Sequence, residues 1–452
     1  MRILWLKSDL LLPLDKGGRL RTWHLMRHLA KRHDITYMSF AGNGQEREIE
    51  GMREVAKDVV TVKRSDPAKR SVLFYMDAAR YLADPLPYAI AKYRSAAYKS
   101  ALAALLRERP FDVIVCDFLV PAVNLPKTLP CPAVIFTHNV EAEIWRRHAD
   151  TKSSVPSRWL YRLQHKRMLR FEDETLQRFD GMLAVSDADR DTIARLYPDA
   201  AKKPAWVVRT GVDTEYFQPN AEREPLNTEP VNLEPRLVFT GSMDWLPNED
   251  AMKYFCADIL PLIRAQVPGV RLSIVGRAPT PAVRALAGDH IEVTGTVDDV
   301  RPYMHKAAVY VVPLRIGGGT RLKIFEAMAM GKAVVSTTVG AEGLPVTDGT
   351  DAVIADDPQA FAAAVVRLLR DDSQRRAIET AARDLVVRHY DWSAVAGELD
   401  EALRVTAALA GGPEGLRDKS KSRKTRHTNE NLNLRTRLHR QRDGSGVRVR
   451  RA

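Results

Sequence analysis

The sequence is poor in cysteine and has no long apolar run. Its 452 residues include only 3 cysteines, Cys116, Cys131 and Cys256, which lie far apart. That spacing excludes a disulfide framework and a cysteine-based metal site, and indicates a reducing, cytoplasmic setting. No stretch approaches the ~20 apolar residues that a membrane-spanning helix needs. The opening residues, MRILWLKSDLLLP, lack the apolar core and cleavage site of a signal peptide and predict a first strand.

Positive charge is concentrated in one part of the chain. The formal net charge is +12, from 69 Lys and Arg against 57 Asp and Glu. Residues 413–452 hold 13 Lys and Arg and 4 acidic residues, so this tail carries +9 and the rest of the chain only +3. The body therefore has no electrostatic footprint of a nucleic-acid binding protein. The tail has too few apolar residues to fold alone.

Short apolar runs alternate with helical patterns such as Leu20–Lys31, Ala91–Arg107 and Leu163–Phe179. Such alternation predicts an α/β protein with two doubly wound parallel sheets, each covered on both faces. The predicted strands of the first sheet are Arg2–Leu6, Ile35–Phe40, Val59–Val62, Val113–Cys116, Ala133–Thr137, Met182–Ser186 and Trp206–Val208. Those of the second sheet are Leu237–Thr240, Leu272–Val275, Ile291–Thr294, Val309–Pro313, Ala333–Thr337 and Ala352–Ile354.

The composition also predicts where the domains divide. A first Rossmann-like domain spans residues 1–217, a Pro- and Glu-rich linker 218–236, and a second Rossmann-like domain 237–390. A C-terminal helix at 391–411 and a basic tail at 412–452 follow. Because ligands of such folds bind at the carboxyl ends of strands, the cleft between two such domains suits two substrates.

Two candidate motifs lie in the first domain. Gly17 and Gly18 end the loop after the first predicted strand and open a helix, where backbone N–H groups favour an anion. The loop lacks the dinucleotide fingerprint GxGxxG, and a plain turn is the alternative. His138 follows a predicted strand at its carboxyl end, suited to touch a reacting group. The alternative is a histidine satisfied by nearby backbone. His24 and His28, four residues apart, have no evident third metal ligand.

The strongest motif is Val311–Leu344, which reads VVPLRIGGGTRLKIFEAMAMGKAVVSTTVGAEGL. A strand leads into three glycines, then Thr320 as the expected N-cap, and a helix that Gly331 ends. Lys323 and Glu326 lie three residues apart on this mostly apolar helix. The apolar residues cover most of the circumference of this helix, which is therefore expected to be buried. Either Lys323 and Glu326 form a weak i,i+3 ion pair, or a phosphate binds at the helix start beside cations while Glu326 accepts from sugar hydroxyls.

This motif resembles the donor site of family 4 GT-B glycosyltransferases, above all the sugar transferases linked to bacterial exopolysaccharide and exosortase clusters. The likeness extends over about residues 1–410 through THNVE, AVSDADRD, VVRTGVDTEYFQP, FTGSMDWLPNEDAMKYF and YDWSAV. It implies that Glu326 binds the nucleotide ribose, that Gly17 and Gly18 adjoin phosphate and acceptor, and that His138 lies in the cleft. The predicted catalytic residues are His138, Arg321 and Lys323; the predicted donor-binding residues are Glu326, Gly317, Gly318, Gly319, Thr320 and Gly241.

Three positions depart from the family pattern. Gly318 stands where many members have a second glutamate that contacts the donor sugar. The segment Gly241–Trp245 lacks the arginine and lysine that commonly hold the diphosphate, so Arg321 and Lys323 are the expected replacements. Thr210 replaces the usual asparagine before Gly-Val-Asp. Asp187-Ala188-Asp189 matches the D-x-D of metal-dependent enzymes of another fold, but after Ser186 it predicts a helix cap.

The resemblance implies a retaining transferase that moves a sugar from a nucleotide-diphosphate donor to a glycan or lipid-linked acceptor, in bacterial polysaccharide synthesis. It implies no cofactor and no metal, because cations and helix dipoles neutralise the leaving diphosphate. Alternatives are a nucleotide-sugar epimerase of the same fold and a nucleic-acid binding protein acting through the tail. The expected location is cytoplasmic, with possible contact at the inner membrane face, where the tail is either merely solvated or drawn to anionic lipid.

Overall fold

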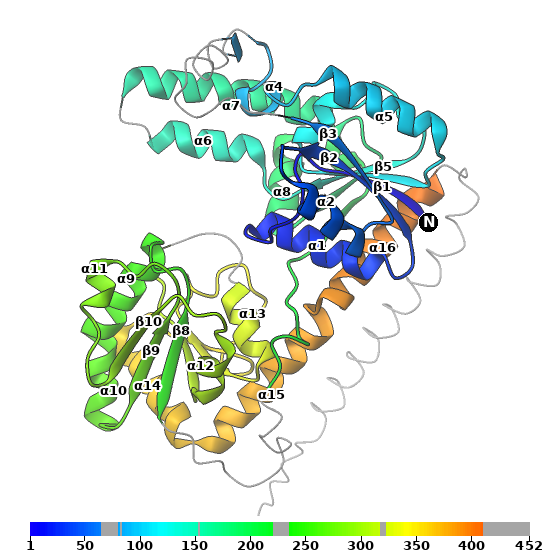
Figure 1. Cartoon of the computed structure of the whole chain (residues 1–452). Helices are drawn as coiled ribbons and strands as arrows, with labels where there is room; N and C mark the ends of the chain where they lie inside the picture. The colour runs from blue at the N-terminus through cyan, green and yellow to red at the C-terminus, as the bar shows by residue number, and fades with distance from the viewer. Residues whose placement is uncertain (65–79, 82–83, 152–153, 220–234, 317–321, 410–452) are drawn as a thin grey trace, which may run out of the picture.

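The computed structural model describes residues 1–64, 80–81, 84–151, 154–219, 235–316 and 322–409. Within these ranges the chain forms two parallel sheets, each flanked by helices (Figure 1). The predicted loop and N-cap residues Gly317, Gly318, Gly319, Thr320 and Arg321 lie outside the described residues. So do most of the predicted linker and all of the predicted basic tail.

The first sheet has seven parallel strands in the order β3-β2-β1-β4-β5-β6-β7. Its strands are almost wholly buried, because helices cover both faces, and so they show no alternation of polar and apolar residues. The strands are β1 (Arg2–Leu6), β2 (Asp34–Ala41), β3 (Asp58–Lys63), β4 (Val113–Asp117), β5 (Ala133–Thr137), β6 (Gly181–Ala184) and β7 (Ala205–Val207). The helices are α1 (Gly17–Leu29), α2 (Glu46–Gly51), α4 (Tyr88–Ala91), α5 (Ala96–Glu108), α6 (Glu141–Thr151), α7 (Val155–Leu176) and α8 (Asp187–Leu196).

The second sheet has six parallel strands in the order β10-β9-β8-β11-β12-β13. The strands are β8 (Arg236–Thr240), β9 (Arg271–Val275), β10 (Ile291–Gly295), β11 (Val309–Val312), β12 (Ala333–Ser336) and β13 (Val353–Ile354). The helices are α9 (Leu246–Tyr254), α10 (Leu260–Gln266), α11 (Pro281–Arg284), α12 (Arg301–Lys306), α13 (Leu322–Ala329), α14 (Pro358–Arg370) and α15 (Asp372–His389), followed by α16 (Trp392–Ala408).

The predicted α/β class and all thirteen predicted strands are confirmed, with strand ends within two residues. The predicted helix Ala91–Arg107 is confirmed as α5 from Ala96 onward, but its predicted start is wrong, because Ala91 is the last residue of the separate short helix α4. Ser95 causes the break: its hydroxyl accepts a hydrogen bond from the Tyr98 amide at 3.2 Å and caps α5. The predicted segment Leu163–Phe179 falls largely within the longer α7.

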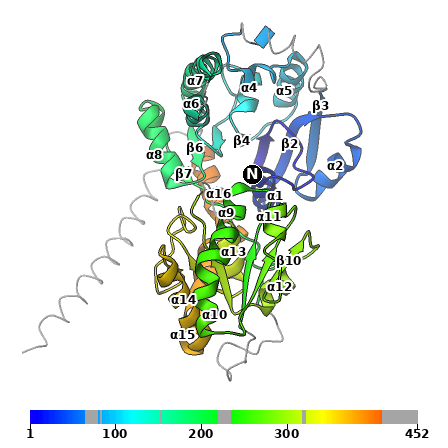
Figure 2. The ribbon, with the colours of Figure 1, turned by 90° about the vertical axis from the view of Figure 1, so that its left-hand side faces the viewer.

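Helix α16 leaves the second half of the chain and packs against α1 of the first half (Figures 1 and 2). Its buried residues join the apolar core that contains Trp5 and Trp23. Trp392, at the first position of α16, is 2% exposed and stacks on His24 with ring centroids 5.1 Å apart. This stacking covers the ring of His24 and helps to hold α16 against α1.

We expect Trp392→Ala to lower the free energy of unfolding by about 3–5 kcal/mol, because a large buried ring is removed from a core shared by α1 and α16. Trp159→Ala is the matched control, since Trp159 is 65% exposed and its loss should change stability by less than about 0.5 kcal/mol. Urea denaturation measures both. Similar losses for the two variants would contradict the role of Trp392 in this core.

Candidate functional site

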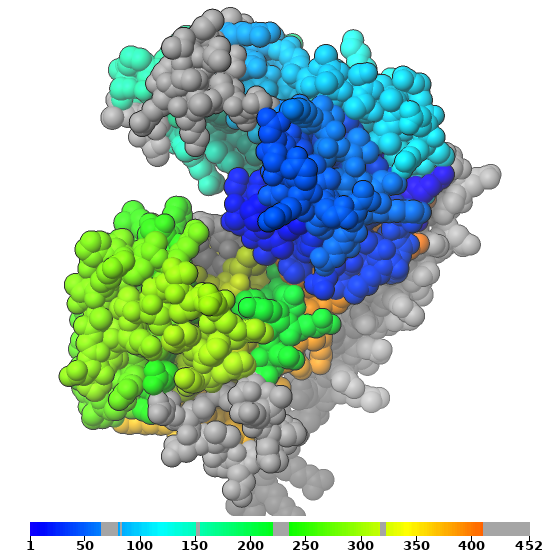
Figure 3. Space-filling view, viewed as in Figure 1, coloured from blue at the N-terminus to red at the C-terminus, as the bar shows by residue number. Residues whose placement is uncertain are grey.

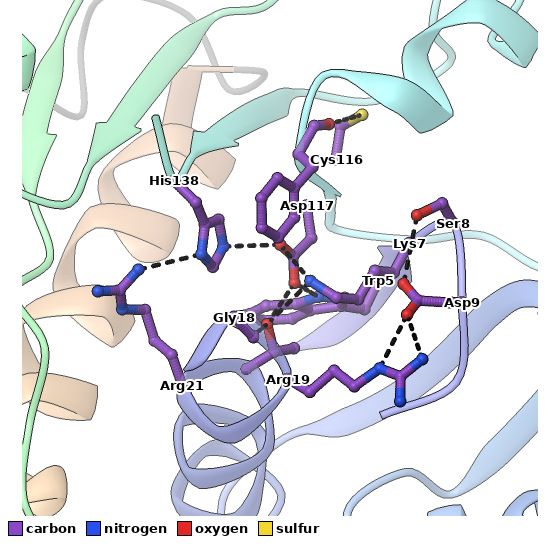
Figure 4. Close-up of polar contacts among 12 residues, drawn as sticks. Trp5, Lys7, Ser8, Asp9, Gly18, Arg19, Arg21, Cys116, Asp117 and His138 are labelled. Carbon is purple, nitrogen blue, oxygen red and sulfur yellow. Dashed lines mark hydrogen bonds and ion pairs between the residues drawn. The ribbon is translucent and has the colours of Figure 1, made fainter. Parts of the chain in front are cut away.

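The first group of polar residues lies where the strand order of the first sheet reverses, between β1 and β4. Lys7 directly follows β1, Asp117 is the last residue of β4, and His138 directly follows β5. Figure 4 shows these side chains converging beside the first turn of α1. The reversal point at the carboxyl ends of parallel strands is where α/β folds leave a crevice for ligands.

Asp117 is fully buried and is the centre of this group. Its carboxylate accepts hydrogen bonds from Lys7 Nζ at 2.9 Å, Trp5 Nε1 at 2.9 Å and the Thr22 hydroxyl at 2.6 Å. Burial alone would raise the pKa of Asp117, but the charge of Lys7 and the contact with His138 hold the pKa well below its usual range. Asp117 is therefore ionised and compensated from three sides.

His138 is held on both ring nitrogens. Nε2 lies 2.8 Å from Asp117 Oδ1, and Nδ1 lies 3.0 Å from Arg21 Nη1. Because a guanidinium can only donate, Nδ1 accepts and Nε2 carries the ring proton toward Asp117. Burial lowers the pKa of His138 to about 4, although Asp117 opposes this shift. The imidazole is therefore neutral at physiological pH, with a fixed tautomer.

Phe118 and Gly18 shape the space beside His138. Phe118 has φ +71°, a left-handed conformation that is uncommon for a bulky residue. Its ring stacks on His138 at 3.9 Å between centroids, and Lys7 Nζ lies 4.2 Å from the ring centroid. A Cβ added at Gly18 would lie 3.0 Å from Phe118 Cζ and 3.7 Å from His138 Nδ1. A strained backbone conformation at a half-buried aromatic residue and close backbone approach are both features of functional sites.

The second group lies at the matching place in the second sheet, between β8 and β11. Gly241 follows β8, and a Cβ there would lie 2.7 Å from Asn248 Nδ2 and 2.8 Å from Lys323 Nζ. Lys323 on α13 donates to Asn248 Oδ1 at 2.9 Å and lies 4.0 Å from the centroid of the Phe239 ring. The structure thus brings two of the predicted residues, Gly241 and Lys323, directly together.

Glu326 lies one helical turn after Lys323 on α13 and is half-buried. Burial raises the pKa of Glu326 to about 7, and the charge of Lys323 only partly offsets that shift. Arg277, just beyond β9, donates from Nε to the Ser242 hydroxyl at 2.8 Å. A cation thus lies beside Gly241–Trp245, although that segment itself contains none. Gly331, at φ +62°, ends α13 as the sequence predicts.

The structure adds residues that the sequence analysis missed: Lys7, Arg21 and Asp117 in the first group, and Asn248 and Arg277 in the second. Thr210, noted as a departure from the family pattern, accepts a hydrogen bond from Arg21 Nη2. A charged residue directly after or at the end of an apolar strand could have signalled Lys7 and Asp117. Arg277 is preceded by the strand and glycine of SIVGR and carries a similar signal.

The molecular surface is hollowed between the two halves (Figure 3). Helices α1 and α13, which carry parts of the two groups, lie on opposite sides of this hollow (Figure 1). A separate cavity of about 810 Å³ lies near the amino ends of β8, β9 and β10, lined by Arg236, Arg271 and His290 among others. It is at the opposite edge of the second sheet from Gly241 and does not include Lys323 or Glu326.

The two remaining sequence motifs have structural roles. The Ser186 hydroxyl accepts from the Asp189 amide at 3.1 Å, so the helix cap predicted at Asp187-Ala188-Asp189 is confirmed. His24 stacks on Trp392, and burial lowers its pKa to about 4. In the described ranges, no group of three or more His, Cys, Asp or Glu side chains is placed to hold a metal ion. The helices in those ranges include none long and apolar enough to cross a membrane.

Known structures share this arrangement. Sucrose-phosphate synthase from Thermosynechococcus elongatus superposes with a TM-score of 0.60 at 17% identity, over 90% of this chain and 100% of that one. The Anabaena protein HepE, in complex with UDP, superposes with a TM-score of 0.61 at 15% identity, over the same shares of the two chains. The two parallel-sheet domains with facing strand ends define the GT-B class of fold.

Sequence comparison gives the family. Residues 16–216 match the model described as Glycosyltransferase Family 4, and residues 234–371 match Glycosyl transferases group 1. Since the two models together cover most of it, the chain belongs to the family 4, group 1 glycosyltransferases. Phosphatidyl-myo-inositol mannosyltransferase of Mycolicibacterium smegmatis is 34% identical over 51% of this chain and 58% of its own length. Glycogen synthase of Mycobacterium tuberculosis is 28% identical over 64% and 67%. The match to the mannosyltransferase thus spans less than two thirds of that relative.

The raised pKa of Glu326 gives a prediction about stability. The folded state binds the Glu326 proton more tightly than the unfolded chain, whose ordinary pKa is 4.5, so folding stability falls as pH rises from 4.5 to about 7. We expect Glu326→Gln to raise the free energy of unfolding at pH 8 by roughly 1–3 kcal/mol relative to the unmodified chain, and by much less at pH 5. Urea denaturation at the two pH values measures both differences. Glu401→Gln, at an exposed glutamate on α16, is the control. An equal effect of Glu326→Gln at both pH values would contradict the burial of a charged carboxyl.

Proposed function

We propose that this protein is a retaining glycosyltransferase that moves a sugar from a nucleotide-diphosphate donor to a glycan or lipid-linked acceptor, in bacterial polysaccharide synthesis. The donor would bind to the second domain, within 237–390, and the acceptor to the first, within 1–217. The observation that carries the proposal is the meeting of Gly241, Lys323 and Asn248 where the strand order of the second sheet reverses. Family membership supports the reaction class.

On the donor side, the proposed roles follow from charge. Lys323 and Arg277 would neutralise the diphosphate as it leaves, because preformed cations in a closed site stabilise developing negative charge without reorganisation. Arg321, predicted for the same role, lies outside the described residues. Glu326 would accept from the ribose hydroxyls. The raised pKa of Glu326 reflects the loss of water around its carboxyl group on burial. Ribose hydroxyls would donate hydrogen bonds in place of those that water made.

On the acceptor side, His138 would contact the sugar or the acceptor rather than serve as a strong general base. Its pKa of about 4, the hydrogen bond of Nδ1 to Arg21 and the contact of Nε2 with Asp117 make the ring a weak proton acceptor. Front-face attack with retention relies on charge stabilisation more than on a strong base, which agrees with this environment. Arg21 would hold the ring and keep a positive charge near the Gly17–Gly18 loop, since burial lowers its pKa only to about 10.

Acceptor-dependent release of nucleotide tests the function. After a stability screen against nucleotide sugars identifies a donor, release of nucleotide diphosphate is measured with and without a polysaccharide or lipid extract. We expect release to require the acceptor. Release with a changed free sugar and no acceptor would favour the nucleotide-sugar epimerase instead. A fluorescence or filter-binding signal for nucleic acid that is lost on removal of residues 412–452, with no sugar transfer, would favour the nucleic-acid binding alternative.

Glu326→Gln tests the donor site directly. We expect the affinity for the nucleotide diphosphate to fall roughly 10- to 150-fold, because charge-assisted hydrogen bonds worth ~1.5–3 kcal/mol are weakened. Calorimetric titration of the nucleotide diphosphate measures this affinity, with Glu401→Gln as the control for the loss of one negative charge. Unchanged affinity in folded Glu326→Gln protein would remove Glu326 from the donor site.

Gly18→Val tests the acceptor side. Since even a Cβ at Gly18 would press on Phe118 and approach His138, the larger side chain must displace one or both rings. We expect transfer to fall by about 100-fold, as for other small displacements of reacting groups, with nearly unchanged nucleotide affinity. Gly17→Ala is the control for folding, because the space around Gly17 is open. Wild-type turnover in Gly18→Val would mean that the loop is only a turn.

A further inference from the structure

Helix α7 (Val155–Leu176) carries two large apolar side chains that are mostly exposed, Val155 at 75% and Trp159 at 65%. In the second half of the described chain, Leu246 is exposed to the same degree as Trp159, at 65%. Both lie in its first turns. The opposite face of the helix is buried through Gln164, Met168 and Phe171, which pack toward the body of the first half. Burial of one face fixes the rotation of α7, so Val155 and Trp159 are held outward rather than left to turn inward.

The outward stripe of α7 continues as a line of cations. Arg162, Lys166 and Arg170 are exposed and follow Trp159 at intervals of three or four residues, the spacing of one helix face. The segment 155–171 contains five Lys and Arg and no Asp or Glu. An apolar tip followed by cations therefore lies on one exposed face, and the stripe ends where Arg170 pairs with the exposed Glu174 at 2.7 Å.

Helices α6 and α7 project together from the first half on the side where the hollow between the halves opens (Figures 1 and 3). Their joined end, which carries Val155, stands farthest from the sheet in that view. Helix α7 thus lies on the first half of the chain, on the side of the molecule where the hollow opens.

We propose that the stripe formed by Val155, Trp159, Arg162, Lys166 and Arg170 docks the protein on an anionic lipid bilayer. Tryptophan favours the boundary between headgroups and acyl chains, and lysine and arginine are attracted to an anionic leaflet. Val155 and Trp159 enter the boundary while the cations contact the headgroups. The two apolar side chains favour a bilayer over a nucleic acid, whose phosphates would use the cations alone. The proposal concerns binding and holds whether or not the protein transfers a sugar.

Vesicle flotation with the full chain tests the proposal. Vesicles of phosphatidylcholine are compared with vesicles that also contain phosphatidylglycerol, at low and high salt. We expect binding to the anionic vesicles, weakened by salt. Arg162→Glu with Lys166→Glu should reduce the partition coefficient at least fivefold, and Val155→Ser with Trp159→Ser should reduce it comparably with less sensitivity to salt.

Matched controls separate α7 from general effects. Arg264→Glu with Arg367→Glu makes the same change in net charge at exposed arginines on α10 and α14. Trp245→Ser removes another tryptophan, 59% exposed, from the second half. Both controls should float like the unmodified chain. All variants keep the basic tail, so binding through the tail would leave the α7 variants bound as tightly as the unmodified chain. That result would overturn the proposal. Equal binding to both vesicle types would overturn it as well.

Two further measurements keep the outcomes distinct. Circular dichroism and nucleotide-diphosphate titration should match the unmodified chain in the α7 variants, because these residues lie on the surface away from Gly241 and Lys323. Loss of vesicle binding with intact nucleotide affinity supports the docking surface independently of sugar transfer. If a DNA duplex binds through Trp159 and Lys166 more tightly than anionic vesicles do, the surface serves nucleic acid and the proposal fails.

Discussion

The buried carboxylate of Asp117 is the constraint on which the first half of the site depends. An ionised carboxylate removed from water must be compensated by charge and hydrogen bonds, or the fold loses several kcal/mol. The compensation comes from separate elements: Lys7 beyond β1, Thr22 on α1 and His138 beyond β5. The contacts that compensate this one carboxylate therefore hold β1, β4, α1 and His138 in fixed positions relative to one another.

The same contacts reach the segments where the chain crosses between the halves. Arg21 bonds to both His138 and Thr210. The next residue, Gly211, lies so close to Trp392 that a Cβ there would approach its ring to 2.6 Å. Val212 in turn pairs with Asp391. The polar site and the two segments in which the chain crosses between the halves thus form one packed unit, which also orients His138 through Arg21.

The sequence predicts the repeating parts of this molecule well and its individual pairings poorly. Strands such as Ala133–Thr137 are recognisable because buried parallel strands are short, apolar and β-branched, and that pattern is local. The helix start at Gly17 and the ending of α13 at Gly331 are local as well. Lys7 and Asp117 are 110 residues apart, and no periodicity relates them. Only the order of strands in the sheet places them together. Sequence motifs therefore predict His138 as a site residue but do not predict Asp117, whose carboxylate contacts it.

The two halves of the site treat buried charge in opposite ways, and this contrast is the physical basis for assigning them different tasks. In the first half, Asp117 is ionised, compensated by neighbours and shifted to a lower pKa, so the group is complete as it stands. In the second half, burial dominates at Glu326 and the pKa rises, since Lys323 offsets only part of the cost of desolvation. A completed network holds geometry, whereas an under-compensated carboxyl gains most when a ligand supplies donors. The contrast therefore agrees with the proposal that the first half positions a reacting group and that the second half binds the donor.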